Sequence, residues 1–147
     1  MTKIKLPQLN DLARLTRTVG KIILNSWKKL KRDDISQKGT NDFVTVVDRL
    51  SERTLIQYIH QRFPHHQILA EESASDTSVD PDRPLWIMDP LDGTTNYIHQ
   101  IPIFAISVAV QWKGVKILAA VHDPCRDETF LSERGKGAWL NHHRIQV

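Results

Sequence analysis

With 147 residues, 40% of them hydrophobic and 25% charged, the chain has the size and composition of one folded domain, which excludes an intrinsically disordered protein. Its net charge of +3 comes largely from the lysines and arginines among the first 32 residues. Aromatic side chains do not alternate with these charges as in a base-stacking platform. We therefore expect the basic residues to form the solvated face of a helix, and we predict no nucleic-acid partner.

The first predicted element is a long helix, because apolar residues recur every three or four positions from Leu9 to Leu30. Residues 38–42 are typical of a loop, and residues 43–47, rich in β-branched side chains, are typical of a strand. A second helix is predicted to begin at Asp48, as its N-cap, and to end at Phe63 before Pro64.

The remainder of the chain predicts a sheet. Short apolar runs separated by turn signals are typical of strands at residues 67–70, 85–88, 104–110, 115–121, 129–131, 138–140 and 144–147. The connections at 112–114 and 141–143 are too short for helical crossovers, so we expect neighbouring strands to be antiparallel. The polar segment 73–84 is typical of a mobile surface loop. The predicted fold is α+β, with two helices packed on an antiparallel sheet in one domain.

Carboxylates directly follow two of these predicted strands. Glu71 and Glu72 come after residues 67–70, Asp89 comes after residues 85–88, and Asp92 lies three positions further on. If the two strands are neighbours, the carboxylates meet at one edge of the sheet, where like charges raise each other's pKa unless a cation neutralises them. Oxygen ligands without histidine or cysteine favour Mg²⁺ over Zn²⁺. We therefore predict a magnesium site, to which the Leu91 carbonyl can contribute.

The residues after Asp92 predict a phosphate site. Gly93 permits close approach of the backbone, and the amides of Gly93, Thr94 and Thr95 can bind an oxyanion if they open a helical turn. A metal next to an anion site indicates phosphoryl chemistry. The alternative is that the two aspartates only cap a turn and bind nothing.

Two other phosphate or metal motifs fail on spacing. A calcium EF-hand loop that begins at Asp89 needs glutamate at its twelfth position, where Gln100 stands. A motif for aspartyl-phosphate chemistry needs a second aspartate where Leu91 stands.

Three motifs in order resemble the inositol monophosphatase family. They are Lys38 with DFVTVVD at 42–48, AEES at 70–73, and DPLDGTTNY at 89–97, and the resemblance continues through GKGAWLN at 135–141. The resemblance implies a Mg²⁺-dependent, lithium-sensitive phosphomonoesterase with a layered αβαβα fold. Residues 1–147 are then expected to be its N-terminal metal- and phosphate-binding half, with the C-terminal half absent.

The resemblance also implies a role for each site residue. Glu71, Asp89 and the Leu91 carbonyl would hold one Mg²⁺, and Asp89 with Asp92 would hold a second. Glu71 and Thr94 would orient and deprotonate the attacking water, with Asp48 accepting a hydrogen bond from the Thr94 hydroxyl. The phosphate would be held, and the anionic substrate steered, by Gly93, Thr94, Thr95 and Lys38.

The chain departs from the family pattern because it stops at Val147, before the aspartate motif that completes the second metal site. One hypothesis is a phosphatase of small phosphorylated polyols such as inositol monophosphate, weakly active or inactive as this truncated chain. Sugar bisphosphates or nucleotide 3′-phosphates are alternative substrates. The other hypothesis is a non-catalytic scaffold or binding module. The family resemblance suggests a homodimer.

The remaining chemistry-bearing residues suggest no further site. The single cysteine, Cys125, excludes an internal disulfide and indicates a reducing cytoplasm. No window approaches the roughly 18 consecutive apolar residues of a membrane span, so no membrane partner is expected. The pairs 65–66 and 142–143 are histidines predicted to be exposed to solvent.

Overall fold

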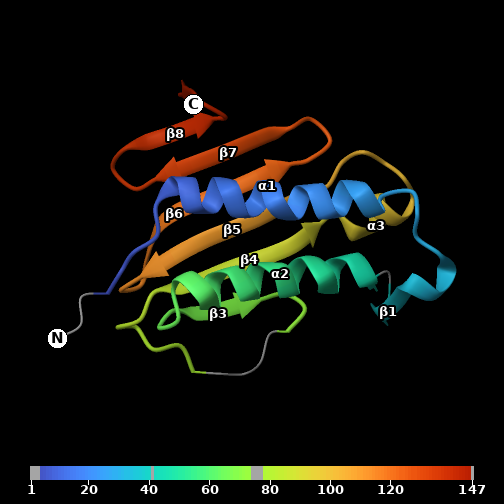
Figure 1. The fold of residues 1–147 in the computed structure, drawn as a ribbon, viewed down its shortest axis with the longest axis horizontal. Coiled ribbons are helices and arrows are strands. Elements are labelled where there is room, and N and C mark those ends of the chain that lie inside the picture. The colour runs from blue at the N-terminus through green and yellow to red at the C-terminus, as the bar shows by residue number, and fades with distance from the viewer. Residues whose placement is uncertain (1–3, 41, 74–77, 147) are drawn as a thin grey trace.

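The structure is a computed structural model that describes residues 4–40, 42–73 and 78–146 (Figure 1). A seven-stranded sheet has the order β3-β4-β5-β6-β7-β8-β9, and a separate hairpin pairs β1 with β2. The helices are α1 (Leu9–Ser26), α2 (Val46–Arg62) and α3 (Thr94–Ile98), and the strands are β1 (Ile35–Gly39), β2 (Asp42–Thr45), β3 (Gln67–Ala70), β4 (Leu85–Asp92), β5 (Ala105–Trp112), β6 (Val115–Asp123), β7 (Glu128–Glu133), β8 (Gly137–Leu140) and β9 (His143–Ile145).

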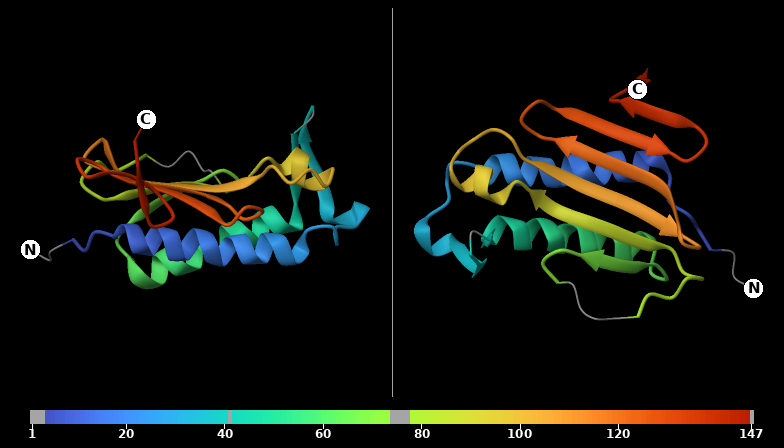
Figure 2. Two further views of the ribbon diagram at one scale, coloured as in Figure 1. Left: turned by 90° about the horizontal axis from the view of Figure 1, so that it is seen from above. Right: turned by 180° about the vertical axis from the view of Figure 1, so that it is seen from behind.

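The two long helices lie side by side on one face of the sheet (Figure 2). The apolar stripe predicted for the first helix is buried there, since Leu12, Val19 and Ile23 have no exposed surface. Gly20 lets α1 approach β6 closely, because a Cβ at this position would lie 2.7 Å from the His122 ring. The predicted α+β class is therefore correct. In the part of the chain that the structure describes, no helix is long and apolar enough to cross a membrane.

The opposite face of the sheet is not covered by any described helix or strand (Figure 2). Cross-strand partners share a face, and one row of partners on this side is formed by Leu69, Ile87, Ala109, Ala119, Ser132 and Ala138. Beside this row, Val121 and Phe130 are cross-strand partners that are 41% and 40% exposed. A contiguous apolar face of this kind favours association.

The exposed pair on β6 and β7 gives a test of this association. Replacing Val121 and Phe130 together with threonine is expected to reduce concentration-dependent self-association, because threonine suits a strand but removes much of the apolar surface. Sedimentation velocity over a series of protein concentrations measures the effect, and thermal unfolding checks that the fold is retained. Self-association of undiminished strength in a folded double variant would contradict the expectation.

The start of the second helix differs from the prediction. Residues 43–47 are only partly a strand, because β2 ends at Thr45 and Val46 begins α2. Thr45 is the N-cap: its hydroxyl accepts from the amides of Val47 and Asp48, at 3.1 and 3.3 Å. Asp48 completes the capping box by accepting the Thr45 amide at 2.8 Å. The prediction of Asp48 as the N-cap was therefore wrong by three positions.

Two other boundaries also differ. The first helix ends at Ser26 rather than at Leu30, because Trp27 is extended and Lys28 has a φ of 63°. The expected loop at 38–42 instead contains the end of β1 and the start of β2, so that Lys38 lies on a strand. Of the expected surface loop at 73–84, positions 74–77 lie outside the described residues.

The expectation of an entirely antiparallel sheet was wrong for one pair. β3 and β4 are parallel, whereas every other neighbouring pair in the sheet is antiparallel. The 14-residue connection from Glu71 to Pro84 is long enough for β4 to begin beside the first residue of β3. A two-residue hairpin cannot do this, because it joins antiparallel strands. The carboxyl ends of β3 and β4 are therefore adjacent, and this parallel pairing determines where the carboxylates that follow the two strands meet.

His66 was predicted to be exposed but is buried, at 5% exposure. The Trp86 indole N–H donates to its Nδ1 at 2.9 Å, so Nδ1 is unprotonated and Nε2 donates to the Lys5 carbonyl at 3.0 Å. This network holds the ring in one neutral tautomer. The predicted exposure of His65, His142 and His143 is confirmed.

Acidification is expected to destabilise the fold through His66. Burial lowers its pKa below the ordinary 6.5, so below pH 6.5 the unfolded chain takes up a proton that the folded chain does not. The free energy of unfolding then falls by at most about 1.4 kcal/mol per pH unit from this group. His66→Gln can keep both hydrogen bonds without titrating, so its stability should fall less steeply with acid.

Denaturant unfolding of both proteins across this pH range measures that difference. His122 is also buried with a lowered pKa, and Asp48, Glu72 and Asp89 have raised pKa values whose effect has the opposite sign. These groups are common to both proteins, so they cancel in the comparison. Identical slopes for the two proteins would contradict a neutral, buried His66.

Candidate metal and phosphate site

The parallel strands place Glu71 beside Asp89. Ala70 pairs with Met88 at the ends of β3 and β4, and the Glu71 amide donates to the Met88 carbonyl at 3.2 Å. The two carboxyl groups, which follow these paired residues, line one hollow, and Glu71 contributes to raising the pKa of Asp89. The predicted meeting of the carboxylates at one edge of the sheet is therefore correct, although its cause is a parallel pair.

Beyond Asp89, an irregularity in β4 turns the backbone toward the site. The register with β5 shifts between Asp89 and Asp92, and the Asp89 Oδ1 accepts the Leu91 amide at 3.0 Å. The shift frees the Leu91 carbonyl from the ladder, where it accepts the Thr94 hydroxyl at 3.0 Å instead. A carbonyl and two carboxylates are thus presented within four residues.

The helical turn that was conditional in the prediction is present. Gly93 is the N-cap of α3 with a φ of 91°, and a Cβ there would lie 2.9 Å from the Ile103 carbonyl oxygen. The Tyr97 amide makes the first bond of the turn, to the Gly93 carbonyl at 2.9 Å. The Tyr97 hydroxyl donates to the Ile23 carbonyl at 2.8 Å, which ties this turn to α1.

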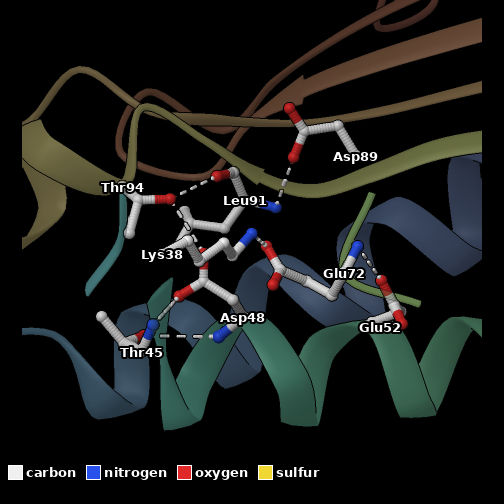
Figure 3. A network of polar contacts seen from close by, with 8 residues as sticks. All are labelled: Lys38, Thr45, Asp48, Glu52, Glu72, Asp89, Leu91 and Thr94. Carbon is white, nitrogen blue, oxygen red and sulfur yellow. Dashed lines mark hydrogen bonds and ion pairs between the residues drawn. The ribbon is translucent and has the colours of Figure 1, made fainter. Parts of the chain in front are cut away.

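Asp48 connects the start of α2 to the Thr94 turn (Figure 3). Its Oδ1 accepts the Thr94 hydroxyl at 2.8 Å, while its Oδ2 accepts the amide and the hydroxyl of Thr45. Asp48 is 1% exposed, and this burial raises its pKa despite the hydrogen bonds from Thr45 and Thr94. The contact between Asp48 and Thr94 that the resemblance implied is present.

Lys38 and Glu72 link the β1–β2 hairpin to the same edge of the sheet (Figure 3). The Lys38 ammonium lies 2.6 Å from the Glu72 Oε1. The Glu72 amide donates to the Glu52 Oε2 at 2.7 Å, and Glu52 is itself 5% exposed. Sequence reasoning missed Glu52. The available signal was its spacing of four residues from Asp48, which places both acids on one face of α2.

The electrostatics of the site are those of crowded carboxylates. Burial, then the hydrogen bond and charge of Glu71, then the charge of Asp92, raise the pKa of Asp89 to about 7. Burial raises the pKa of Glu72, and the Lys38 ion pair acts in the opposite direction. Near neutral pH Asp89 therefore holds a proton in a large fraction of the molecules, and a bound cation would displace that proton.

The predicted residues fall into two groups around a hollow of about 270 Å³. It is lined by Phe43, Glu71, Asp89, Leu91, Asp92, Gly93, Thr94, Thr95 and Asn96. Asp48 and Lys38 are not among these lining residues. Asp48 contacts Thr94 of the lining, and Lys38 contacts Glu72, the neighbour of Glu71. In the described ranges, no three Asp, Glu, His or Cys side chains converge on one point. The carboxyls of Glu71 and Asp89 and the Leu91 carbonyl, all from residues that line the hollow, nevertheless form an all-oxygen set, which fits Mg²⁺.

Comparisons with known proteins agree with this arrangement. The sequence model described as the inositol monophosphatase family matches residues 8–147. A relative from Escherichia coli K12 named "Nus factor SuhB" is 44% identical over 140 residues, which cover 95% of this chain and 52% of that protein. The chain thus spans about half the length of the curated relatives it matches, consistent with the N-terminal half of the family. The expectation that the chain has no nucleic-acid partner is not supported by its similarity to a relative named as a Nus factor.

Solved structures show the same fold. The Thermotoga maritima IMPase is 37% identical with a TM-score of 0.86, over 95% of this chain and 53% of that one. A staphylococcal inositol monophosphatase-1, described as a "100 mM LiCl soaked inhibitory complex", is 26% identical with a TM-score of 0.83, over 97% and 55%. The motifs, the fold and these matches agree, and the chain belongs to the inositol monophosphatase family.

Proposed function

We propose that residues 1–147 form the metal- and phosphate-binding unit of a Mg²⁺-dependent phosphomonoesterase that hydrolyses small phosphorylated polyols. One observation carries the proposal: the paired ends of β3 and β4 place Glu71 and Asp89 around one hollow with Asp92 and residues 93–95. This combination of clustered carboxylates and free helical amides suits the binding of a metal and a phosphate side by side.

Glu71, Asp89 and the Leu91 carbonyl would hold one Mg²⁺, and Asp89 with Asp92 a second. Bound there, the ions would lower the pKa of a water molecule and neutralise charge on the leaving oxygen. Contacts within the chain hold these ligand residues in position. Asp89 is held by the Leu91 amide, and the strand pairing at Ala70 and Met88 holds Glu71 beside it.

Thr94 and Asp48 provide a path for the proton of the attacking water. The single proton of the Thr94 hydroxyl lies within reach of two acceptors, the Asp48 Oδ1 at 2.8 Å and the Leu91 carbonyl at 3.0 Å. The lone pairs of the hydroxyl therefore remain to accept a hydrogen bond from water. In this path the water proton passes to the Thr94 Oγ1, and the Thr94 proton passes to the Asp48 carboxylate. The raised pKa of Asp48 makes it a stronger proton acceptor than an ordinary aspartate.

The phosphate would lie against the start of α3. The amides before Tyr97 have no acceptor within the turn, since Tyr97 donates its first bond. The amides of Gly93, Thr94 and Thr95 can therefore donate to phosphate oxygens. Lys38 would steer the anionic substrate from the β1–β2 hairpin, where its contact with Glu72 keeps the ammonium at the edge of the site.

Phosphate release from inositol monophosphate, with Mg²⁺ and with EDTA, tests the proposal together with calorimetric titration of Mg²⁺. Saturable Mg²⁺ binding with Mg²⁺-dependent release, even at a low rate, is expected. Release that survives both EDTA and Asp89→Asn would contradict the proposal. Parallel assays with a sugar bisphosphate and a nucleotide 3′-phosphate identify the substrate class, because the shared motifs bind metal and phosphate but not the alcohol.

A second candidate is a non-catalytic binding module. The relatives named as Nus factors, and the uncovered apolar face of the sheet, favour it. In that case the chain would act by protein contacts and turnover would be absent even with Mg²⁺ bound. Turnover at the rate of a complete enzyme would exclude this candidate.

Three further properties belong to the proposal. Lithium inhibition is supported by the lithium-soaked staphylococcal relative, and a homodimer by the family resemblance. A cytoplasmic location is supported by the single cysteine, Cys125, whose pKa is raised by burial and which forms no disulfide.

A further inference from the structure

A second hollow, of about 430 Å³, lies between the outer side of α1 and the turn that joins β8 to β9. It shares no lining residue with the candidate site. Arg14, Arg17 and Lys21 line it from α1, and Asn141 and His142 from the turn. No aspartate or glutamate is present among its described lining residues. The hollow is therefore cationic, and Arg17 lies between Arg14 and Lys21 in the sequence of α1.

Arg17 is held in position by neutral groups. Its Nε donates to the Thr129 Oγ1 at 3.1 Å, and one Nη donates to the Asn141 Oδ1 at 3.3 Å. The same Asn141 oxygen accepts the Thr129 amide at 2.9 Å, and Thr129 is fully buried. The guanidinium thus has a fixed orientation, has no acidic partner among the described residues, and has further N–H groups available to a ligand.

Arg14 and Lys21 add positive charge to the hollow beside Arg17. Arg14, Arg17 and Lys21 are spaced three and four residues apart on α1, where like charges repel and reduce helix stability. In the described part of the chain, the side chains of Arg14 and Lys21 form no ion pair. A bound anion would relieve this repulsion.

We propose that this hollow binds an oxyanion of the phosphate class, with the Arg17 guanidinium as its anchor and Arg14 and Lys21 as electrostatic support. A guanidinium with a fixed plane matches two oxygens of a phosphate. Among the described residues that line the hollow there is no phenylalanine, tyrosine or tryptophan for a base to stack on. The prediction that these basic residues form only a solvated helix face is thereby extended: three of them converge with a turn more than a hundred residues away in sequence.

Titration of the isotopically labelled chain with inorganic phosphate, followed by ¹H–¹⁵N NMR, tests the proposal. EDTA is kept present so that no divalent metal can hold phosphate at the candidate site. Saturable shifts are expected at the Arg17 Nε–H and at Asn141. Arg17→Lys, which keeps the charge and loses the fork, is expected to weaken binding about tenfold or more.

Lys21→Gln is the second variant, because Lys21 makes no contact that the fold needs. It should weaken binding roughly twofold to fivefold. Lys116→Gln removes the same charge from exposed β6, outside the hollow, and should change nothing. If phosphate gives no saturable shift, or if Lys21→Gln and Lys116→Gln weaken it equally, the proposal is overturned.

A short single-stranded DNA distinguishes the source of the phosphate. If the ligand is a polymer, the oligonucleotide should bind more tightly than inorganic phosphate, with an affinity that falls with salt and a salt slope reduced in Arg14→Gln and Lys21→Gln. If the ligand is a free phosphate ester, the oligonucleotide should show no such advantage. Both results support an oxyanion site and assign its source.

Discussion

Replacing Asp89 with asparagine is expected to abolish the stabilisation of the chain by Mg²⁺ while leaving the metal-free fold as stable as before, or more stable. Asparagine has the same size and keeps an oxygen to accept the Leu91 amide, but it removes a charge that burial, Glu71 and Asp92 all disfavour. At Mg²⁺ concentrations about 100 times the dissociation constant, the unmodified chain should gain about 2.7 kcal/mol of unfolding free energy. The variant should gain none.

Thermal unfolding with and without Mg²⁺, at a pH above the raised pKa of about 7, measures both effects. Asp127→Asn is the matched control, because it removes one charge from an exposed turn where the φ of 52° suits asparagine equally well. An equal gain with Mg²⁺ in Asp89→Asn and the unmodified chain would place the ion elsewhere.

Replacing Asp48 with alanine is expected to cost roughly 2 to 4 kcal/mol of unfolding free energy. The buried amide and hydroxyl of Thr45 would both lose their acceptor, and the capping box of α2 would open. The Thr94 hydroxyl would keep only the Leu91 carbonyl. Denaturant unfolding measures the loss of stability.

Two milder variants separate this structural role from the proton path. Asp48→Asn keeps one acceptor oxygen and should lose less stability than the alanine variant. Thr94→Val has the same shape and leaves the Thr45 bonds intact, but it removes the donor to the buried Asp48 Oδ1. It should therefore lose about 1 kcal/mol, less than the alanine variant at Asp48, while losing hydrolysis. A Thr94→Val variant with undiminished phosphate release would remove Thr94 from the proposed chemistry.

The part of the hollow's lining that runs from Asp89 to Gly93 could be predicted because these residues are adjacent in sequence. Asp89, Leu91, Asp92 and Gly93 lie within five residues, and the order of a short motif with a proline and a glycine specifies its own backbone. The apolar stripe of α1 was equally local. The parallel pairing of β3 with β4 could not be predicted in this way. Short turns identify hairpins, but a long connection such as residues 71–84 does not specify the direction of the next strand.

Ends of elements and buried polar contacts were harder to predict, for physical reasons. Thr45 continues a β-branched run, yet its hydroxyl can cap a helix, and only the position of Asp48 three residues on distinguishes the two. His66 follows a helix stop, where exposure is common. Its burial depends on the Trp86 indole, which lies 20 residues away. Glu52 likewise has its partner 20 residues away, at the Glu72 amide.

The edge position of β3 has a consequence for how the site moves. This four-residue strand is hydrogen-bonded to β4 alone within the described sheet, so it can fray while the central strands stay closed. Glu71 follows that strand directly, whereas Asp89 lies on the better anchored β4. Amide protons of β3 should therefore exchange with solvent earlier than those of β5. A cation bound by both carboxylates would slow that exchange, because it would link the end of the edge strand β3 to the more stable strand β4.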